Sequence, residues 1–287
     1  MSEQKYRLGI DIGGTKMAAV LIDADNKAVT DSQLATPKDD LNHFIIMIKA
    51  LLEPLQEKAT EDKAIISSLG IGVPAPVDYE NQKILTADNL NIISNLKLIE
   101  RIQEQIKLDM PMKLDNDVNC FVRGEAILGA GKDINNVYGI TIGTGIGGGW
   151  WFNKQIYTGA HGGAGEICDM LIDLDNKITL EQAYQKLTQN NPKILAQEAY
   201  EGDQLAEKSF EELGEYLGMA FANIVNILDP GIIIVGGGAT ASSDLFLNTA
   251  KKTMAKYITT EEARKIKIVK SKLKQNAGAI GAALLFK

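Results

Sequence analysis

The residues Asp11-Ile12-Gly13-Gly14-Thr15-Lys16 directly follow the apolar run Leu8-Gly9-Ile10. This order predicts a strand that ends in a tight turn bearing one carboxylate, one hydroxyl and one amine. Because glycines lack a Cβ, the backbone N–H groups of such a turn can approach an anion closely. A carboxylate beside the turn favours phosphate bound with Mg²⁺ over bare phosphate. A nucleotide-phosphate loop and an ordinary β-hairpin turn are both consistent with this stretch.

The composition is typical of a soluble globular protein and narrows the classes of partner. Of the 287 residues, 45% are hydrophobic and 23% are charged, and the net charge is −7. An acidic balance without a basic run argues against nucleic acid and membrane partners. The two cysteines lie far apart, no signal peptide is present, and no apolar run approaches the roughly 18 residues that span a bilayer. We therefore expect a reduced, cytoplasmic protein of two domains.

The periodicity of apolar residues predicts an α/β fold. Three short strands, Leu8–Ile12, Met17–Ile22 and Ala28–Leu34, precede the first helix. Further strands are predicted at 65–73, 112–114, 137–142, 232–235 and 266–269, and helices at 41–58, 96–108, 115–128, 204–228, from about 244, and 277–285.

An internal similarity links the two halves of the chain. Leu8–Thr15 aligns with Tyr138–Gly145 without a gap, and Gly, Ile, Ile and Gly coincide. Each copy is predicted to form a strand, a glycine turn and a second strand. Chance also produces such matches in segments rich in Gly and Ile. A true repeat predicts two similar domains, each offering a glycine hairpin to the same phosphates.

Two glycine clusters match dinucleotide-binding patterns but lack the context that those patterns require. Gly143–Gly148 matches G-x-G-x-x-G, yet Trp150-Trp151-Phe152 continues as a strand where a helix should begin. Gly236–Ala241 matches G-x-G-x-x-A between a strand and a helix, but too few residues follow to complete a dinucleotide fold. The sequence therefore disfavours an oxidoreductase.

Asp117 is the candidate general base, since it follows a short buried strand and begins a helix. A kinase needs a carboxylate to accept the hydroxyl proton of its acceptor. Helix capping would account for only one of Asp115, Asn116 and Asp117. A zinc site at His161 and Cys168 is disfavoured because no closely spaced Cys/His pair exists.

Five motifs in order resemble the repressor/ORF/kinase (ROK) family of sugar kinases, within the actin-like ATPase superfamily. The motifs are Asp11–Lys16, Gly72–Asp78, Asn116–Cys120, Gly143–Gly148 and Gly163–Ile167. The resemblance covers the chain from Leu8 to the final helix. It implies a duplicated, ribonuclease H-like α/β fold of two domains with a cleft between them. The small domain would comprise residues 1–116 plus 276–287, and the large domain residues 117–275.

The resemblance also implies ATP and Mg²⁺ as cofactors and assigns roles by motif. The first phosphate loop would comprise Asp11, Gly13, Gly14, Thr15 and Lys16. Asp11 would bind Mg²⁺ through a water molecule. Thr144 and Gly145 would form the second phosphate loop, and Gly236, Gly237 and Gly238 would hold adenosine. Asp117 would be the catalytic base, and the sugar would contact Asn89, Asn116, Asp117, Glu166, Asp169 and Glu181.

The chain departs from the family pattern on the sugar side. Typical members read Gly-Glu-Ile-Gly-His, whereas Cys168-Asp169 follows Glu166-Ile167 here. Residues 170–181 contain no cysteine or histidine, so the resemblance implies a zinc-free variant. Asp169 in its ionised form only accepts hydrogen bonds, unlike a neutral imidazole. Ala75 stands where glycine is usual, so the identity of the sugar stays open.

The expected activity is that of a glucokinase-like enzyme that phosphorylates the 6-OH of glucose or a close hexose. N-acetylmannosamine and β-glucosides are alternative acceptors. A non-catalytic sugar-sensing protein is the rival hypothesis, because the family includes repressors. Those carry a DNA-binding helix-turn-helix before the first strand, whereas only seven residues precede Leu8 here. The resemblance further implies a homodimer, with sugar and ATP as its small-molecule partners.

Overall fold

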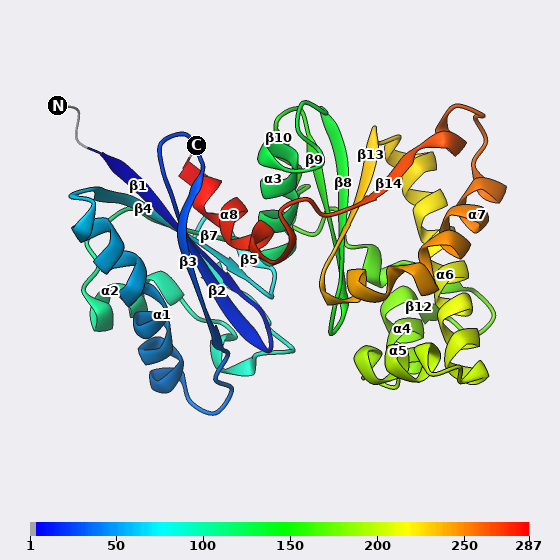
Figure 1. Cartoon of the computed structure of the whole chain (residues 1–287), viewed down its shortest axis with the longest axis horizontal. Helices are drawn as coiled ribbons and strands as arrows, with labels where there is room; N and C mark the ends of the chain where they lie inside the picture. The colour runs from blue at the N-terminus through cyan, green and yellow to red at the C-terminus, as the bar shows by residue number, and fades with distance from the viewer. Residues whose placement is uncertain (1–3, 287) are drawn as a thin grey trace. The chain divides into compact units, whose positions relative to one another are not determined.

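The computed structural model describes residues 4–286, and the chain divides into two compact α/β units (Figure 1). Unit 1 is formed by Met1–Gly129, Thr158–Gly163 and Leu273–Lys287. Unit 2 is formed by Ala130–Tyr157 and Ala164–Lys272. Unit 1 therefore combines the N-terminal and the C-terminal segments of the described chain.

The division between the units differs in position from the predicted boundary after residue 116. Helix α3 (Asp117–Leu128) belongs to unit 1, because it packs against the C-terminal helix α8 (Ala277–Ala283). The first unit consequently ends after α3, and the chain returns to it at Leu273 rather than at residue 276. Thr158–Gly163 also joins unit 1, which no local sequence pattern indicated.

Unit 1 is built on a five-stranded mixed sheet in the order β3-β2-β1-β4-β7. β1 pairs antiparallel with β2 and parallel with β4, and β4 pairs parallel with β7. The strands are β1 (Lys5–Ile12), β2 (Lys16–Ile22), β3 (Ala28–Ala35), β4 (Ile65–Val73) and β7 (Met112–Asn116). A separate hairpin pairs β5 (Val77–Asp78) with β6 (Lys83–Ile84).

The two faces of this sheet are covered by different helices. On one face, apolar side chains of α1 (Leu41–Glu61) and α2 (Leu98–Ile106) form the main core of unit 1 with the strands. On the other face, α8 packs Ala279, Ile280 and Ala283 against Val20. Along β2, Ala19 and Leu21 point into the main core, whereas Val20 between them points toward α8. Successive side chains of a strand point to opposite faces of the sheet, so β2 contributes to both cores.

Unit 2 repeats the same topology. Its sheet has the order β10-β9-β8-β13-β14, with an antiparallel hairpin at its centre and two parallel strands beyond it. The strands are β8 (Asn136–Ile142), β9 (Ile146–Phe152), β10 (Gln155–Ile156), β13 (Ile232–Gly236) and β14 (Lys267–Lys270). The aligned segments Leu8–Thr15 and Tyr138–Gly145 therefore occupy equivalent strands and turns in the two units.

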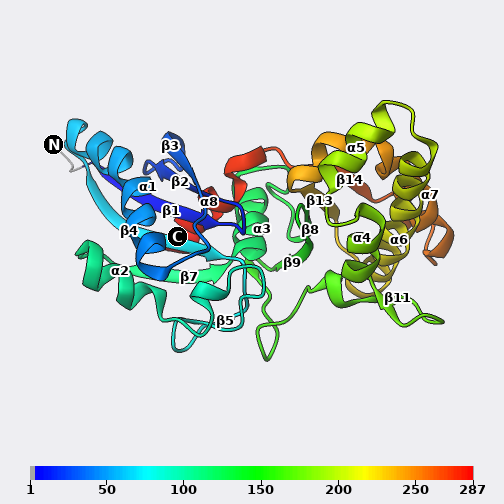
Figure 2. The ribbon, with the colours of Figure 1, turned by 90° about the horizontal axis from the view of Figure 1, so that it is seen from below.

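Four helices accompany the sheet of unit 2 (Figure 2). They are α4 (Leu180–Thr188), α5 (Pro192–Tyr200), α6 (Gln204–Leu228) and α7 (Leu247–Tyr257). The long α6 packs against the other three and supplies much of the apolar core. A small hairpin, β11 (Leu171–Asp173) with β12 (Ile178–Thr179), precedes α4. Within residues 4–286, no helix is long and apolar enough to cross a bilayer.

Backbone contacts hold α8 in unit 1. A Cβ at Gly9 of β1 would overlap the carbonyl oxygen of Ala279, and one at Gly70 of β4 would overlap that of Ala282. On the side of α8 that faces α3, a Cβ at Gly281 would overlap the carbonyl oxygen of Cys120. Because each obstacle is backbone, it cannot move aside as a flexible side chain would.

We expect Gly281→Ala to lower the free energy of unfolding by about 1–3 kcal/mol, the usual range for overpacking. The higher helix propensity of alanine, about 1 kcal/mol, opposes this effect and is outweighed. Urea unfolding measures the difference. Gly163→Ala is the matched control, since a Cβ there meets no atom within 4 Å. Equal stability of the two variants would contradict the tight packing of α8.

Candidate functional site

The first predicted phosphate loop is the turn between β1 and β2 in unit 1. Gly13 N donates to Lys16 O at 2.9 Å, which closes the turn. Thr36 ties it to the end of β3, because its hydroxyl donates to Gly13 O at 2.7 Å and its N–H to Thr15 O at 3.0 Å. The side chains of Thr15 and Lys16 are exposed. The loop thus has a fixed backbone and offers a hydroxyl and an amine to a ligand.

Strand register brings the other predicted residues of unit 1 to the same edge of the sheet. Asp11 pairs with Gly72, and Gly72 pairs with Asp115, so β1, β4 and β7 end together. Asp117 begins α3 directly after β7. A Cβ built at Gly14 would lie 3.7 Å from that of Asn89, so Asn89 flanks the glycine turn. The candidate base and the first phosphate loop therefore share one edge.

Asp11 is a half-buried carboxylate beside the start of α8. A Cβ at Gly278 would overlap its Oδ2, so the absence of a side chain at residue 278 makes room for it. Burial raises the pKa of Asp11 to about 6, and Lys16 only partly opposes this. Among residues 4–286, no group of three His, Cys, Asp or Glu side chains forms a metal cage. A lone carboxylate next to a phosphate loop fits Mg²⁺, which keeps several waters and takes its other ligands from substrate phosphates.

The raised pKa of Asp11 makes a prediction for the ligand-free protein. In the folded state Asp11 holds its proton more tightly than in the unfolded chain, so it destabilises the protein as pH rises from about 4 to 6. Asp11→Asn should therefore increase the free energy of unfolding at pH 7.5 by about 1–3 kcal/mol, with a smaller gain at pH 4.5. Urea titrations without Mg²⁺ or nucleotide at both pH values measure this. A gain in the free energy of unfolding that is equal at both pH values would show that the pKa of Asp11 is not raised in the folded protein.

The N-terminus of α3 separates the roles of three adjacent polar residues. Asn116 is the cap, since its Oδ1 accepts from Val118 N at 2.9 Å and Asn119 N at 3.1 Å. Asp117 is the first helical residue, and its Oδ1 accepts from Val118 N at 2.9 Å. The helix dipole stabilises negative charge at this position. Asp117 is thus held at a site suited to an ionised carboxylate.

Asp115 belongs to a buried polar network that the sequence did not reveal. It forms an ion pair with Arg123 and accepts from Tyr79 Oη at 2.8 Å and Asn119 Nδ2 at 3.2 Å. Burial alone would lower the pKa of Arg123, but the charge and hydrogen bond of Asp115, together with Cys120 and Tyr79, outweigh this and raise it. The eight-residue separation of Asp115 and Arg123 is not a recognisable local pattern. Tyr79 comes from the β5–β6 hairpin, a separate segment.

Breaking this ion pair should cost far more than breaking an exposed one. Arg123→Met leaves Asp115 buried without its cation, and we expect the free energy of unfolding to fall by about 3–5 kcal/mol. Adding Asp115→Asn should recover part of the loss, because the double variant buries no unpaired charge. Arg101→Met, which breaks the exposed Arg101–Glu104 pair, should change stability by less than about 1 kcal/mol. Equal losses in the single and double variants would show that the charges are not coupled.

The second predicted phosphate loop joins β8 to β9 in unit 2. Gly143 N donates to Gly145 O at 2.8 Å, and the side chain of Thr144 is exposed. After this loop the chain continues as strand β9 through residue 152. A dinucleotide-binding loop would instead begin a helix at this point. Gly236, the last residue of β13, pairs with Thr141, so Gly236–Gly238 lies at the edge where β8 ends. Gly237 has a φ of 84°, which favours glycine, and lies against the backbone of Ile142.

Glu166, Cys168 and Asp169 lie on or beside a short 3₁₀ turn, Ile167–Asp169, in unit 2. Burial raises the pKa of Glu166, and the thiol of Cys168 lies 3.5 Å from its Oε2. Burial, with the nearby carboxylates, raises the pKa of Cys168 to about 12, so the thiol stays protonated at neutral pH. The preceding Gly165 has a φ of 97°, and its carbonyl accepts from Tyr138 Oη at 2.5 Å. The turn is therefore anchored to the central strand of the sheet.

Glu181 has a position that the resemblance alone did not indicate. The sequence predicts that it contacts the sugar, and in the structure its Oε2 accepts from Ile146 N at 2.7 Å. The carboxylate thus lies next to the second phosphate loop. Glu181 is the second residue of α4, whose start is secured by a capping box between Thr179 and Gln182.

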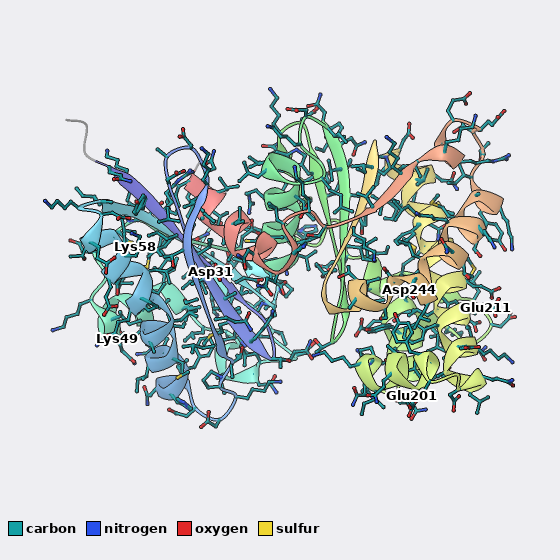
Figure 3. The ribbon with its side chains drawn as sticks, viewed as in Figure 1. Asp31, Lys49, Lys58, Glu201, Glu211 and Asp244 are labelled. Atoms are coloured by element: carbon teal, nitrogen blue, oxygen red, sulfur yellow. The ribbon has the colours of Figure 1, made fainter. Side chains whose placement is uncertain are left out.

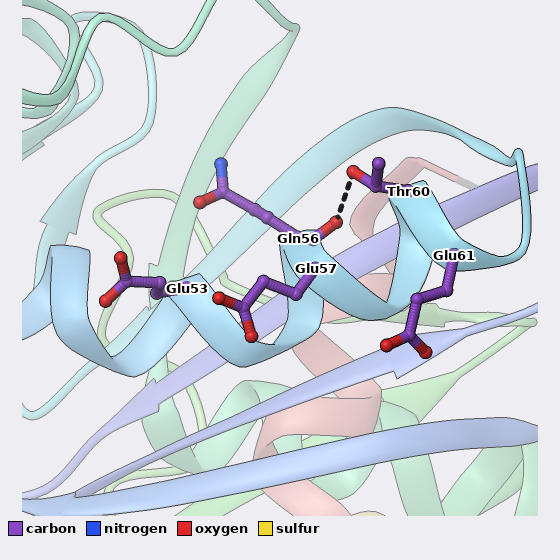
Figure 4. Close-up of a pocket in the computed structure, with 5 residues that line it drawn as sticks. All are labelled: Glu53, Gln56, Glu57, Thr60 and Glu61. Atoms are coloured by element: carbon purple, nitrogen blue, oxygen red, sulfur yellow. Dashed lines mark hydrogen bonds between the residues drawn. The ribbon is translucent and has the colours of Figure 1, made fainter.

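A separate surface pocket lies on α1 (Figure 4). It is lined by Glu53, Gln56, Glu57, Thr60 and Glu61, none of which is a predicted site residue. Three carboxylates on its wall would repel phosphate. This pocket therefore plays no part in the candidate nucleotide site.

Two units of equal sheet order, each led by a glycine hairpin, define the chain as a member of the actin-like ATPase fold class. Residues 7–287 match the model of the ROK family, and the chain belongs to that family.

Named relatives are similar along almost their full length. The N-acetyl-D-glucosamine kinase of Vibrio cholerae is 28% identical, over 96% of this chain and 98% of that protein. The glucokinase of Thermotoga maritima is 25% identical, over 98% of this chain and 96% of that protein. The crystal structure of a ROK family glucokinase from Streptomyces griseus, in complex with glucose and AMPPNP, has a TM-score of 0.81. That glucokinase is 26% identical to this chain, and the superposition covers 98% of both chains.

Proposed function

We propose that the protein is an ATP-dependent sugar kinase that transfers the γ-phosphoryl group to the 6-OH of a hexose. The observation that carries the proposal is the placement of Asp11 and Asp117 at one edge of the unit 1 sheet. The full-length similarity to kinases of glucose and N-acetylglucosamine supports this class of acceptor. We take glucose or a close hexose as the substrate.

On the donor side, the proposal assigns ATP to the two glycine hairpins. Asp11 would hold Mg²⁺ through water, and the bound ion would neutralise charge on the phosphates. Thr15 and Lys16 would contact the phosphates from one loop, and Thr144 and Gly145 from the other. Adenosine would lie at Gly236–Gly238. Backbone amides fixed in advance stabilise transferred charge without reorganising during the reaction.

On the acceptor side, Asp117 would accept the proton of the sugar hydroxyl as the phosphoryl group is transferred. Asn116 caps α3 with its Oδ1, and its amide nitrogen makes only a long bond of 3.4 Å to Ala75 O, which leaves donor capacity for a sugar hydroxyl. Asn89, Glu166, Asp169 and Glu181 would supply further contacts. Burial raises the pKa of Glu166, and its carboxyl oxygens can accept hydrogen bonds from sugar hydroxyls.

The experiment is an ADP-release screen with Mg²⁺-ATP over glucose, mannose, N-acetylglucosamine, N-acetylmannosamine and β-glucosides. Release that depends on one of these sugars is the expected result. Release of ADP that is independent of sugar would contradict the proposal.

Asp117→Asn should then lower kcat on the best sugar by about 10²–10⁴-fold, because general-base catalysis contributes that range. Sugar binding, measured by calorimetry, should persist. Asp31→Asn is the matched control, an exposed carboxylate on β3 (Figure 3) that should leave kcat unchanged. Near-normal turnover in Asp117→Asn would remove Asp117 from the role of base.

A further inference from the structure

Helix α4 supports the second phosphate loop through three side chains. Tyr184 Oη donates to Gly143 O at 2.6 Å, and Gln185 Nε2 donates to Thr144 O at 2.7 Å. Glu181 Oε2 accepts from Ile146 N at 2.7 Å. Each of these bonds ends on the backbone of the loop, so together they fix its path from Gly143 to Ile146.

The three side chains form one rigid set. Residues 181, 184 and 185 are spaced i, i+3 and i+4, so they share one face of α4. Tyr184 is only 1% exposed, which removes freedom from its ring. Gln185 Nε2 also lies 2.5 Å from Glu181 Oε1 and joins two of the contacts to each other. The Thr179–Gln182 capping box holds the N-terminal turn on which Glu181 lies.

Gly145 makes room for this arrangement. A Cβ there would lie 2.9 Å from Glu181 Oε1, so a side chain at residue 145 would push the carboxylate out of its present position. Glycine, however, gives the unsupported turn more conformational freedom than any other residue. The hydrogen bonds from α4 restore the order that the glycines remove. A phosphate loop benefits from such order, because its amides then need not reorganise when charge is transferred.

We propose that Glu181, Tyr184 and Gln185 are positioning residues that hold loop 143–146 in its ATP-binding conformation. This inference rests on the proposed function and deepens it. Gln185 has a second effect, since its donor offsets the negative charge of Glu181 close to the phosphates. Glu181 retains acceptor capacity after its two hydrogen bonds and can still contact a sugar hydroxyl. In this arrangement, Glu181 of α4 contacts both the proposed ATP-binding loop and the proposed sugar.

The test compares Tyr184→Phe and Gln185→Leu with the control Lys186→Ala, whose side chain is exposed on the same helix. Each of the first two variants loses a hydrogen bond to the loop backbone. We expect KM for Mg²⁺-ATP to rise about 3- to 10-fold in both, in keeping with the worth of one hydrogen bond. KM for the sugar and the melting temperature should match those of Lys186→Ala, a pattern that a merely structural role would not produce.

Calorimetric binding of AMPPNP separates this inference from the proposed function, because it does not require turnover. Binding of the nucleotide analogue that is 3- to 10-fold weaker in Tyr184→Phe and Gln185→Leu supports the inference. Unchanged binding in both variants overturns it, as do equal rises in both KM values together with a lower melting temperature. Failure of the wild-type protein to phosphorylate any sugar, with AMPPNP binding still dependent on Gln185, would contradict the proposed function alone.

Discussion

In unit 1, the backbone of α8 lies so close to β1, β4 and α3 that a single added methyl group would overlap a carbonyl oxygen at each contact. The rest of the candidate site in this unit depends on that approach. Gly278 leaves space for the carboxylate of Asp11, and Gly281 brings α8 against Cys120, one turn into the helix that Asp117 begins. A helix of small residues from the end of the chain thus sets the spacing of the first phosphate loop and the candidate base.

The charged groups of this edge are arranged at some cost in stability. Asp11 is desolvated and carries a raised pKa, which favours a bound cation over the empty state. Asp115 is more deeply buried than Asp11, yet its charge is compensated by Arg123, Tyr79 and Asn119. These three adjacent residues therefore have different roles. Asp115 stabilises the fold, Asn116 caps α3, and Asp117 places a carboxylate at the N-terminus of the helix. Marginally stable proteins commonly keep such unfavourable groups where they bind ligands.

The sequence predicted the features that depend on local patterns. Strand periodicity located β1, β4, β8 and β13, and the similarity of Leu8–Thr15 to Tyr138–Gly145 anticipated two sheets of equal order. The features that it did not reveal depend on contacts between distant segments. The packing of α3 on α8 moved the division between the units from residue 116 to residue 129. The Asp115–Arg123 pair joins a strand end to the next turns of a helix, and the Glu181–Ile146 bond joins α4 to a hairpin 35 residues earlier. Neither leaves a periodic signal in the sequence.

We propose that the chain couples ATP to phosphorylation of a hexose at its 6-OH, and ³¹P NMR of the reaction mixture tests this most directly. With Mg²⁺-ATP and the best sugar of the screen, the account predicts equal growth of ADP and of one phosphomonoester signal. That signal should show coupling to the two protons on C6. Conversion of ATP to ADP and inorganic phosphate without a phosphomonoester signal, or a phosphoryl group on another carbon, would contradict it.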